Sequence, residues 1–475
     1  MTSPMVMGIQ GWSSYVPHYS LRKSSIAQFL GTPNVEGLRS VASFDEDSVS
    51  MAVEAARALP SSDTGLTGLI LVTSTPPYFE KTNAATVHAA LRLDTTIRSV
   101  DQIGSRRSAM AAIDSACCVS SSGPQVVVFS DTRNGLPGGP DEATGGDGAA
   151  AILFSEKPAA VCEGRASRTA EVMANWRLAT SSNASSWEPR FQEYAYALIA
   201  EEAAAEALKM ANLTGSQVDH FVSSGSPPRL FNGVRNALSI SDRAEGLRAG
   251  GIGDTGTADM ALGLIEALER AKPGEVILCL SVADGADALV FRTTDQLPEA
   301  QAATRCKLSA RLSALPVELD YSKFLEWNGR LQPQPPRRPL PVAPTAPPSL
   351  RNERWKFALI GSKCMVCGAV HLPPARRCRH CRSLDQMEPC PMADRLGVLF
   401  AHTVDHLSPG PGGPTVIGLV DFPEGGRFRC ELTDVVPAEL HRGLQMRMTF
   451  RCFYTAGDIK NYFWKAAPVR PMDEP

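Results

Sequence analysis

The segment VDQIGSRRSAMAAI, residues 100–113, joins an extended approach to an alanine-rich helix start through a Gly-Ser turn. A junction of this kind places one side chain at a helix N-terminus, where unpaired N–H groups and the helix dipole stabilise an anion. That position suits a thiolate nucleophile. The turn itself, Gly104 to Ser108 with the sequence GSRRS, contains no cysteine. This junction, the elbow, therefore needs a chemistry other than the one a thiol supplies.

Strand-like and helix-like segments alternate on both sides of the elbow. Apolar runs of strand length occupy residues 66–72 and 125–129, and an amphipathic helical pattern occupies residues 49–56. A strand, a turn rich in Gly, Asp and Ala, and a second strand follow one another at residues 125–154 and again at residues 275–291. The alternation predicts α/β layers, and the repeated pattern indicates two similar halves.

Length and composition are those of a soluble, multidomain protein. The chain has 475 residues, of which 43% are hydrophobic and 20% charged, so we expect two or three domains. The net charge of −3 argues against nucleic-acid binding, although residues 351–475 hold 17 Lys/Arg against 13 Asp/Glu. No apolar run reaches transmembrane length and the N-terminus lacks a signal-peptide pattern, so we expect a cytoplasmic protein without membrane attachment. Eight of the twelve cysteines are scattered, which indicates a reducing compartment without disulfides.

A proline-rich spacer separates the C-terminal part from the rest. Eight of the eighteen residues at 331–348 are proline, which predicts an extended linker within a connecting segment, residues 301–350. Residues 351–392 contain two Cys-x2-Cys pairs, whose four thiolates predict a Zn²⁺ site that is structural rather than catalytic. The predicted ligands are Cys364, Cys367, Cys378 and Cys381. Residues 393–475 contain short strands separated by Gly and Pro turns, which predicts a small β-barrel.

Several short motifs occur in a characteristic order along the first 300 residues. They are Tyr15-Val16-Pro17, Phe44-Asp45-Glu46-Asp47, Met51-Ala52-Val53-Glu54-Ala55-Ala56, Thr144-Gly145-Gly146-Asp147-Gly148-Ala149 and Gly253-Asp254-Thr255-Gly256. In this order they resemble the thiolase superfamily, specifically its HMG-CoA synthase and ketoacyl synthase III branch, over residues 5–300. Residues 351–475 resemble the zinc-ribbon and OB-fold partner proteins that accompany thiolase-like enzymes and help them hold acyl-CoA.

The resemblance implies an architecture and a ligand. The core is expected to be a duplicated thiolase-like α/β fold, layered α-β-α-β-α, with its halves at residues 1–160 and 161–300. A zinc ribbon at residues 351–392 and an OB-fold at residues 393–475 are expected to follow. The implied substrate or ligand is a coenzyme A thioester, and the implied assembly is a homodimer in which the strand at residues 125–129 pairs across a two-fold axis.

The same resemblance identifies what the chain lacks. The family's catalytic set is a nucleophilic Cys, a His, and a Glu or an Asn depending on the branch. The Cys position at the elbow corresponds to Arg106, and the His position before Ser-Pro corresponds to Gly225 in the sequence VSSGSP. The Glu falls near Thr75, and the Asn of the Gly-Asn-Thr motif is Asp254. All the signature groups are therefore replaced.

Four residues are candidates to act in their place. Tyr78, after two prolines near the missing Glu, is a candidate general acid, with packing as its alternative role. Asp254 is a candidate base if it is desolvated. Ser105 lacks a visible base, and capping of the elbow helix is its alternative role. Arg106 stays protonated and cannot be the nucleophile, so Arg106 or Arg107 should pair with a carboxylate such as Asp254 or with an acidic group of the substrate, unless both point into solvent.

Four arginines crowd around the second pair of zinc-ligand cysteines. Guanidinium groups pair well with phosphates, so they are candidates for holding the nucleotide end of CoA. They are Arg376, Arg377, Arg379 and Arg382. The alternative is that they form a solvated face of the zinc ribbon.

Two tryptophans bracket a segment that could flank an acyl channel. Trp176 is followed by Arg177, and Trp187 begins the sequence WEPRF. Ordinary packing of a lid is the alternative.

Two functions remain open at this point. The first is an enzyme that makes or breaks a carbon–carbon bond on a CoA thioester without an acyl-cysteine, by aldol, retro-aldol or acyl-transfer chemistry. An aldol step needs an oxyanion hole and an acid/base pair but no nucleophile. The second is a non-catalytic acyl-CoA-binding or scaffolding subunit that works with partner enzymes in a complex. An HMG-CoA synthase-like acyltransferase is a distant third.

Overall fold

The computed structural model describes residues 7–32, 36–60, 65–118, 123–225, 228–241, 246–247, 251–313, 317–334 and 341–470. The chain forms two compact units. The first contains Met1–Ala42, Ala55–Ala85 and Thr95–Tyr321, and the second contains Ser43–Glu54, Thr86–Asp94 and Ser322–Pro475. The domain limits expected at residues 160, 300, 350 and 392 remain predictions, and part of the proline-rich spacer, residues 335–340, lies outside the described residues.

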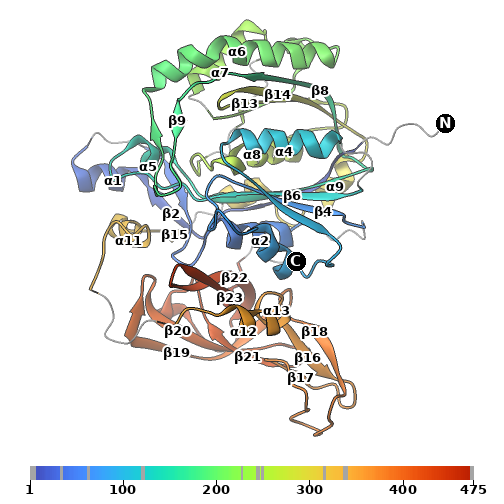
Figure 1. Cartoon of the computed structure of the whole chain (residues 1–475), viewed down its shortest axis with the longest axis vertical. Helices are drawn as coiled ribbons and strands as arrows, with labels where there is room; N and C mark the ends of the chain where they lie inside the picture. Colours follow the sequence, from blue (N-terminus) through green and yellow to red (C-terminus); the bar gives the residue numbers. More distant parts are fainter. Residues whose placement is uncertain are drawn as a thin grey trace, which may run out of the picture. The chain divides into compact units, whose positions relative to one another are not determined.

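The first unit is built on a ten-stranded sheet with the order β12-β11-β13-β14-β8-β1-β7-β6-β4-β5 (Figure 1). Its strands are β1 Gly8–Tyr15, β4 Gly68–Thr73, β5 Arg98–Ile103, β6 Gln125–Asp131, β7 Gly148–Ser155, β8 Ala160–Thr169, β11 His220–Ser224, β12 Gly246–Leu247, β13 Val276–Val282 and β14 Gly285–Thr293. Two small sheets accompany it, β15-β2-β3 and the hairpin β9-β10. Their strands are β2 Tyr19–Arg22, β3 Leu38–Val41, β9 Asn175–Trp176, β10 Ser185–Ser186 and β15 Val317–Glu318.

The large sheet consists of two halves with the same topology. One half has the order β1-β7-β6-β4-β5 and the other β8-β14-β13-β11-β12. In both halves the first two pairings are antiparallel and the last two are parallel. The halves join where β1 pairs with β8, with Ile9 opposite Ala160. The two similar halves predicted from the sequence are therefore confirmed.

Helices lie between and outside the two halves of the sheet (Figure 1). The helices α4 (Arg107–Cys118) and α8 (Thr257–Arg270) lie between them, and α6 (Pro189–Met210) and α7 (Pro228–Ala237) cover the outer face of the second half. Residues 257–268 of α8 are all buried, including the polar side chains of Thr257, Asp259 and Glu266. The other helices of this unit are α1 Lys23–Leu30, α5 Pro140–Thr144, α9 Leu297–Ala303 and α10 Leu308–Ser313, while α2 Ser48–Arg57 and α3 Ala84–Ala90 span both units.

The strand expected to pair across a two-fold axis is not at an edge of the sheet. β6, which contains residues 125–129, hydrogen-bonds to β4 on one side and to β7 on the other. Residues 125–129 therefore pair on both sides within the chain, and the prediction that this strand pairs with its copy across a two-fold axis is wrong. The edge of this half is β5, which pairs only with β4 among the described strands.

The second unit combines a three-stranded sheet, β17-β16-β18, with a five-stranded sheet, β21-β20-β19-β22-β23. Its strands are β16 Ile360–Cys364, β17 Val370–His371, β18 Met387–Pro391, β19 Gly397–Gly410, β20 Gly413–Asp421, β21 Arg427–Glu431, β22 Gln445–Ala456 and β23 Ile459–Pro468. Its helices are α11 Tyr321–Trp327, α12 Ala346–Arg351 and α13 Glu353–Lys356. None of the helices in the described ranges of the whole chain is long and apolar enough to cross a membrane.

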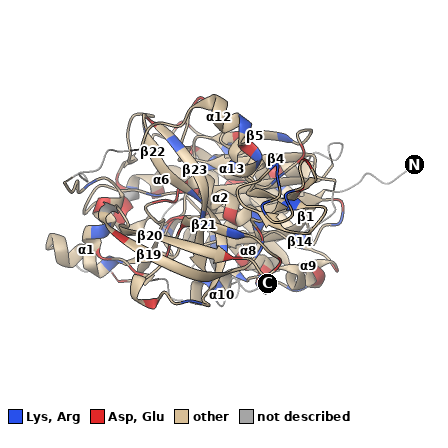
Figure 2. Cartoon of the chain, turned by 90° about the horizontal axis from the view of Figure 1, so that it is seen from below, with Lys and Arg blue, Asp and Glu red and all other residues tan. Residues whose placement is uncertain are grey.

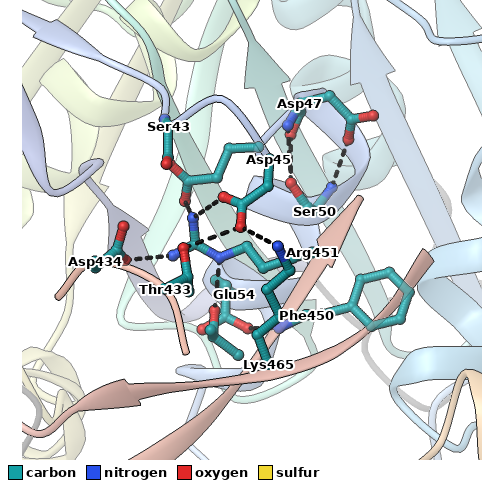
Figure 3. Close-up of polar contacts among 12 residues, drawn as sticks. Ser43, Asp45, Asp47, Ser50, Glu54, Thr433, Asp434, Phe450, Arg451 and Lys465 are labelled. Atoms are coloured by element: carbon teal, nitrogen blue, oxygen red, sulfur yellow. Dashed lines mark hydrogen bonds and ion pairs between the residues drawn. The ribbon is translucent and has the colours of Figure 1, made fainter. Parts of the chain in front are cut away.

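A buried cluster of charges joins residues 43–54 to the five-stranded sheet within this unit (Figure 3). Arg451 on β22 contacts Asp45 at 3.1 Å and Asp434 at 2.6 Å, and its side chain is fully buried. Lys465 on β23 contacts Asp45 at 3.0 Å. Burial alone would raise the pKa of Asp45, but the charges of Lys465 and Arg451 outweigh it and lower that pKa to about 2.

Candidate functional site

A cavity of about 1090 Å³ lies in the first unit, at the carboxyl ends of parallel strands from both halves of the sheet. Ser74 and Ile103 line it from the ends of β4 and β5, which are parallel neighbours. Gly225 and Ala283 line it just beyond the ends of β11 and β13, the equivalent parallel pair of the second half. Ligand sites of open α/β sheets occur at this edge.

The elbow forms part of the cavity wall. Gly104 has a φ of 130°, a conformation that a residue with a side chain rarely adopts, and it turns the chain from β5 into α4. The Arg107 N–H donates to the Ser105 hydroxyl at 3.3 Å, so Ser105 takes the capping role at this helix start. Ser105 and Arg106 both line the cavity. The residue at the elbow position is thus a guanidinium that faces the ligand space.

Arg106 forms an ion pair with Asp254. Asp254 comes from the loop before α8, which is the counterpart of the elbow in the second half. Burial would raise the pKa of Asp254, but the guanidinium groups of Arg106 and Arg133 outweigh it and lower that pKa to about 2. The expected ion pair is therefore present, and Asp254 is ionised at neutral pH. The two side chains are 17% and 33% exposed, so a ligand in the cavity can reach both.

Asp131 organises the floor beneath this pair. It is the last residue of β6 and is fully buried. Its carboxylate accepts hydrogen bonds from the hydroxyls of Thr73 (2.8 Å), Ser74 (2.7 Å) and Thr75 (2.9 Å), and from the Thr257 N–H at the start of α8 (2.7 Å). Asp131 therefore fixes the end of β4 to the start of α8. Sequence reasoning missed it, although an acidic residue that ends an apolar strand is a detectable signal.

Arg107 points to a different set of partners. Its guanidinium contacts Asp287 at 2.8 Å and donates to the Ser167 hydroxyl at 2.8 Å and to the Asp284 carbonyl at 2.9 Å. These partners lie on β14, on β8 and on the turn between β13 and β14. Arg107 thus fastens the start of α4 to the second half of the sheet, and Arg106 is the arginine that faces the cavity.

The positions of the missing His and Glu contain no acid/base group. Gly225 has a φ of 97°, and a Cβ atom there would lie 2.1 Å from the Val282 carbonyl oxygen, so this backbone leaves no room for any side chain. The Ser226 and Pro227 that follow lie outside the described residues. Thr75 is neutral, and its hydroxyl donates to Asp131 and accepts from the Thr132 N–H at 3.1 Å. Among the described residues that line the cavity there is neither a cysteine nor a histidine.

Tyr78 is not among the side chains that line the cavity. Its loop contributes Ser74, Pro76 and Phe79 instead. The Tyr78 backbone is held by Asn83, whose amide donates to the Tyr78 carbonyl at 2.8 Å. The structure therefore brings Ser105, Arg106 and Asp254 together and leaves Tyr78 outside this group.

The two tryptophans do line the cavity, from the hairpin β9-β10 and the residue that follows it. Their ring centroids are 6.2 Å apart. Arg177 anchors the hairpin through the carbonyl oxygens of Ser74 and Ser181. The Trp187 N–H donates to the Ala174 carbonyl at 2.9 Å, which closes the base of the hairpin.

The four predicted zinc ligands converge in the second unit. The sulfur atoms of Cys364, Cys367, Cys378 and Cys381 all lie within 4.8 Å of one another. The Cys364–Cys381 and Cys367–Cys378 sulfur pairs are each 3.6 Å apart. Tetrahedral Zn–S bonds of about 2.3 Å place sulfurs roughly 3.8 Å apart, so the cluster fits one zinc ion with four thiolate ligands. A site closed by four protein ligands is structural.

The four arginines near this cluster are all exposed. Arg376 is paired with Asp385 at 2.9 Å, and Arg377 donates to the Arg382 carbonyl at 3.3 Å. In Figure 2 basic and acidic residues are interspersed along β19–β21 rather than sorted by sign. Arg377, Arg379 and Arg382 have no carboxylate partner among the described ion pairs, so they are the arginines of this group most open to an anion.

Comparisons with protein families match the C-terminal region. The family model described as "ChsH2, rubredoxin-like zinc ribbon domain" matches residues 357–388, and that described as "ChsH2, C-terminal OB-fold domain" matches residues 392–451. The "DUF35 domain-containing scaffold protein" of Methanocaldococcus jannaschii is 28% identical over 126 residues, which are 26% of this chain and 89% of that protein. The predicted zinc ribbon and OB-fold are thereby confirmed.

The remaining part is similar to several curated and solved proteins. Hydroxymethylglutaryl-CoA synthase of Methanopyrus kandleri is 30% identical over 318 residues, which are 62% of this chain and 89% of that protein. The same enzyme of Aeropyrum pernix is 29% identical over 343 residues, 68% of this chain and 94% of that protein. A crystal structure of HMG-CoA synthase complexed with CoA matches with a TM-score of 0.60 and 21% identity, covering 68% of this chain and 90% of that one. The predicted thiolase-like fold is confirmed by these matches.

Proposed function

Because this chain belongs to the hydroxymethylglutaryl-CoA synthase family, we propose that it binds a CoA thioester in the cavity and makes or breaks a carbon–carbon bond without an acyl-cysteine. The observation that carries this proposal is the Arg106–Asp254 ion pair at the elbow. A guanidinium is not a nucleophile, so no acyl group can be transferred to this position. It is instead a strong hydrogen-bond donor for an oxygen that becomes negatively charged.

An aldol or retro-aldol reaction fits these groups. In the cleavage direction the β-hydroxyl loses its proton, the bond between Cα and Cβ breaks, and a carbonyl compound and a thioester enolate form. The enolate then takes up a proton at Cα. We assign the stabilisation of the enolate oxygen to Arg106, which lines the cavity. The N–H groups of Arg107 and Thr257 at the starts of α4 and α8 already donate to Ser105 and Asp131, so they are not assigned this role.

The proposal changes the role expected for Asp254. A carboxylate whose pKa is about 2 is a weak base, so Asp254 serves to orient Arg106 and does not accept the substrate proton. Proton transfer falls to the other carboxylates that line the cavity. These are Asp141, Glu188, Asp259 and Asp284.

The nucleotide end of CoA needs a separate contact. We propose that the exposed arginines of the zinc ribbon bind its phosphates, with Arg377, Arg379 and Arg382 contributing more than Arg376, which Asp385 already neutralises. Changing all four to Gln should weaken CoA binding in isothermal titration. An unchanged affinity for CoA would show that the four arginines only form a solvated surface.

A second candidate function is a non-catalytic acyl-CoA-binding subunit. It is favoured by the lack of Cys and His among the described cavity-lining residues, and by the likeness of the C-terminal part to a scaffold protein. This candidate predicts that acyl-CoA binds and is recovered unchanged.

One experiment separates the two candidates. Purified protein is incubated with a panel of acyl-CoAs and 3-hydroxyacyl-CoAs, and bound ligand and released products are both quantified. Arg106→Gln should abolish product formation, whereas Arg270→Gln at the far end of α8 should act like the wild type. Binding without products in the wild type would favour the scaffold, and no binding at all would overturn both candidates.

A further inference from the structure

The hairpin beside the cavity carries aromatic rings that the described residues of the first unit cover only in part. Trp176 is 39% exposed, Trp187 is 57% exposed, and Phe79 on the facing loop is 54% exposed. All three line the cavity. Large apolar side chains that stay exposed on a concave wall mark a site for an apolar ligand.

Trp176, Trp187 and Phe79 form an aromatic wall, and the hairpin part of this wall is held in place by hydrogen bonds. The amide of Gln192 on α6 donates to the carbonyls of Ala174 and Trp187 at 3.4 Å. Arg177 ties the hairpin to the Ser74 carbonyl, just beyond the end of β4. Because the hairpin is fixed at its base and at its flank, its rings form a built surface rather than a loose lid.

The cavity is large enough for the thioester end of CoA together with an acyl group. Its volume of about 1090 Å³ lies above the range of about 300–1,000 Å³ that is usual for small-molecule sites. Ile103 and Pro76 extend the apolar lining from the rings toward the elbow, where Arg106 and Asp254 supply the polar groups. Arg177 and Glu188, the chain neighbours of the two tryptophans, also line the cavity, so the lining fits an amphipathic ligand whose apolar part lies against the rings.

We propose that the acyl group of the natural thioester is bulky and apolar, with a ring system that stacks against Trp176, Trp187 and Phe79. This inference rests on the proposed function and names its substrate class. An acetyl or acetoacetyl group would leave the aromatic rings uncovered, so contacts with these rings would contribute little to its binding free energy. The two indole planes are inclined by 50°, so a ring system that lies against one indole would meet the other at an angle and reduce the exposure of both.

The test compares CoA thioesters of different acyl groups by titration calorimetry and tryptophan fluorescence. Acetyl-CoA, acetoacetyl-CoA, cyclohexanecarboxyl-CoA and 2-naphthoyl-CoA are titrated into the wild type and into the double variant Trp176→Ala/Trp187→Ala. Tyr194→Ala is the matched control, because Tyr194 lies on α6, is 86% exposed and does not line the cavity. Circular dichroism and melting temperature confirm that each variant is folded.

The wild type should bind naphthoyl-CoA at least about tenfold more tightly than acetyl-CoA. The double variant should lose that advantage while its affinity for acetyl-CoA changes less than twofold, and Tyr194→Ala should behave as the wild type. Equal affinity for all four thioesters would overturn the substrate class while leaving CoA binding intact. Failure of every thioester and of free CoA to bind would instead overturn the proposed function itself.

Discussion

At the elbow, the position that the family resemblance assigns to a nucleophile is occupied by a cation, Arg106, with Asp254 as its counter-ion. The N-terminus of a helix repels a positive charge, and Asp254 compensates because its own loop brings it to the same point. This pairing could be predicted from the sequence, since both residues occupy motif positions. The lack of space for a side chain at the His position could not be predicted from the sequence. It is caused by the Val282 carbonyl, which packs against Gly225 and lies 57 residues further along the chain.

Restoring the thiol alone should not restore acyl transfer. In Arg106→Cys the new thiol would lie beside the carboxylate of Asp254, which opposes thiolate formation, and no histidine could assist it at Gly225. Synthase turnover should stay at background in a coupled assay with acetyl-CoA and acetoacetyl-CoA. The double variant Arg106→Cys/Asp254→Asn serves as the control that removes the repulsive charge. Turnover at a rate well above background in the single variant would show that a base exists elsewhere in the cavity.

At the scale of elements, periodicity predicts most central strands and helices, because they are buried and apolar. It misses β8 and β23, whose sequences AVCEGRASRT and IKNYFWKAAP mix polar and apolar residues. The order of strands is a non-local property, so the edge of the sheet could not be derived from the sequence. The family resemblance assigns the two-fold pairing to residues 125–129, but both sides of β6 are occupied by β4 and β7.

The open edge at β5 predicts how two copies associate. A strand with one row of unpaired N–H and C=O groups is a template for pairing, so we expect a homodimer through β5 with a mass near twice 50.9 kDa in light scattering. In hydrogen exchange, dilution should expose the amides of β5 but leave those of β6 protected. A mass of 50.9 kDa at micromolar concentration, with unprotected β5 amides, would contradict this expectation.

At the scale of the whole molecule, the sequence separates the C-terminal module at its proline-rich spacer but hides the attachment of residues 43–54 to it. Phe44-Asp45-Glu46-Asp47 reads as the acidic start of a helix, and only the structure shows that Asp45 is neutralised by Arg451 and Lys465. These partners lie about 400 residues away along the chain, beyond the reach of any local pattern.

The charge cluster should make the second unit sensitive to acid. The folded pKa of Asp45, about 2, is below the ordinary value of 3.8, so its stabilisation is present above about pH 4 and is lost as the pH falls toward 2. The contribution at neutral pH is about 2 kcal/mol. Asp45→Asn should cost about 3 kcal/mol because it removes one carboxylate partner from each of two buried cations, Arg451 and Lys465, which keep only Asp434, Glu46 and Glu431. The loss of stability can be measured locally by hydrogen exchange of the β22 and β23 amides.

The exposed pair Asp421–Arg427 provides the matched control for this cluster. Asp421→Asn should change protection by less than about 1 kcal/mol, since exposed ion pairs contribute little. Protection of β22 in Asp45→Asn equal to that of the wild type at neutral pH would show that the cluster does not stabilise the unit.

Zinc should hold the ribbon together. Residues 360–391 contain only three short strands, β16, β17 and β18, so four Zn–S bonds are needed to order them. Elemental analysis should find one zinc per chain. A strong chelator should remove the zinc, and the β16 amides should then lose their protection from hydrogen exchange. A well-protected β16 after complete removal of the metal would argue against this role.

The central claim is that the elbow carries no acyl group during the reaction. Intact-mass spectrometry of the wild type after rapid quenching, with acetyl-CoA, acetoacetyl-CoA and 2-naphthoyl-CoA supplied in excess, tests it directly. A single species at the unmodified mass of the chain is expected at every time point, while CoA binding is demonstrated in parallel. A stable adduct, in which the mass of the chain increases by that of the acyl group, would contradict this expectation. It would indicate that the protein is an acyl-enzyme transferase.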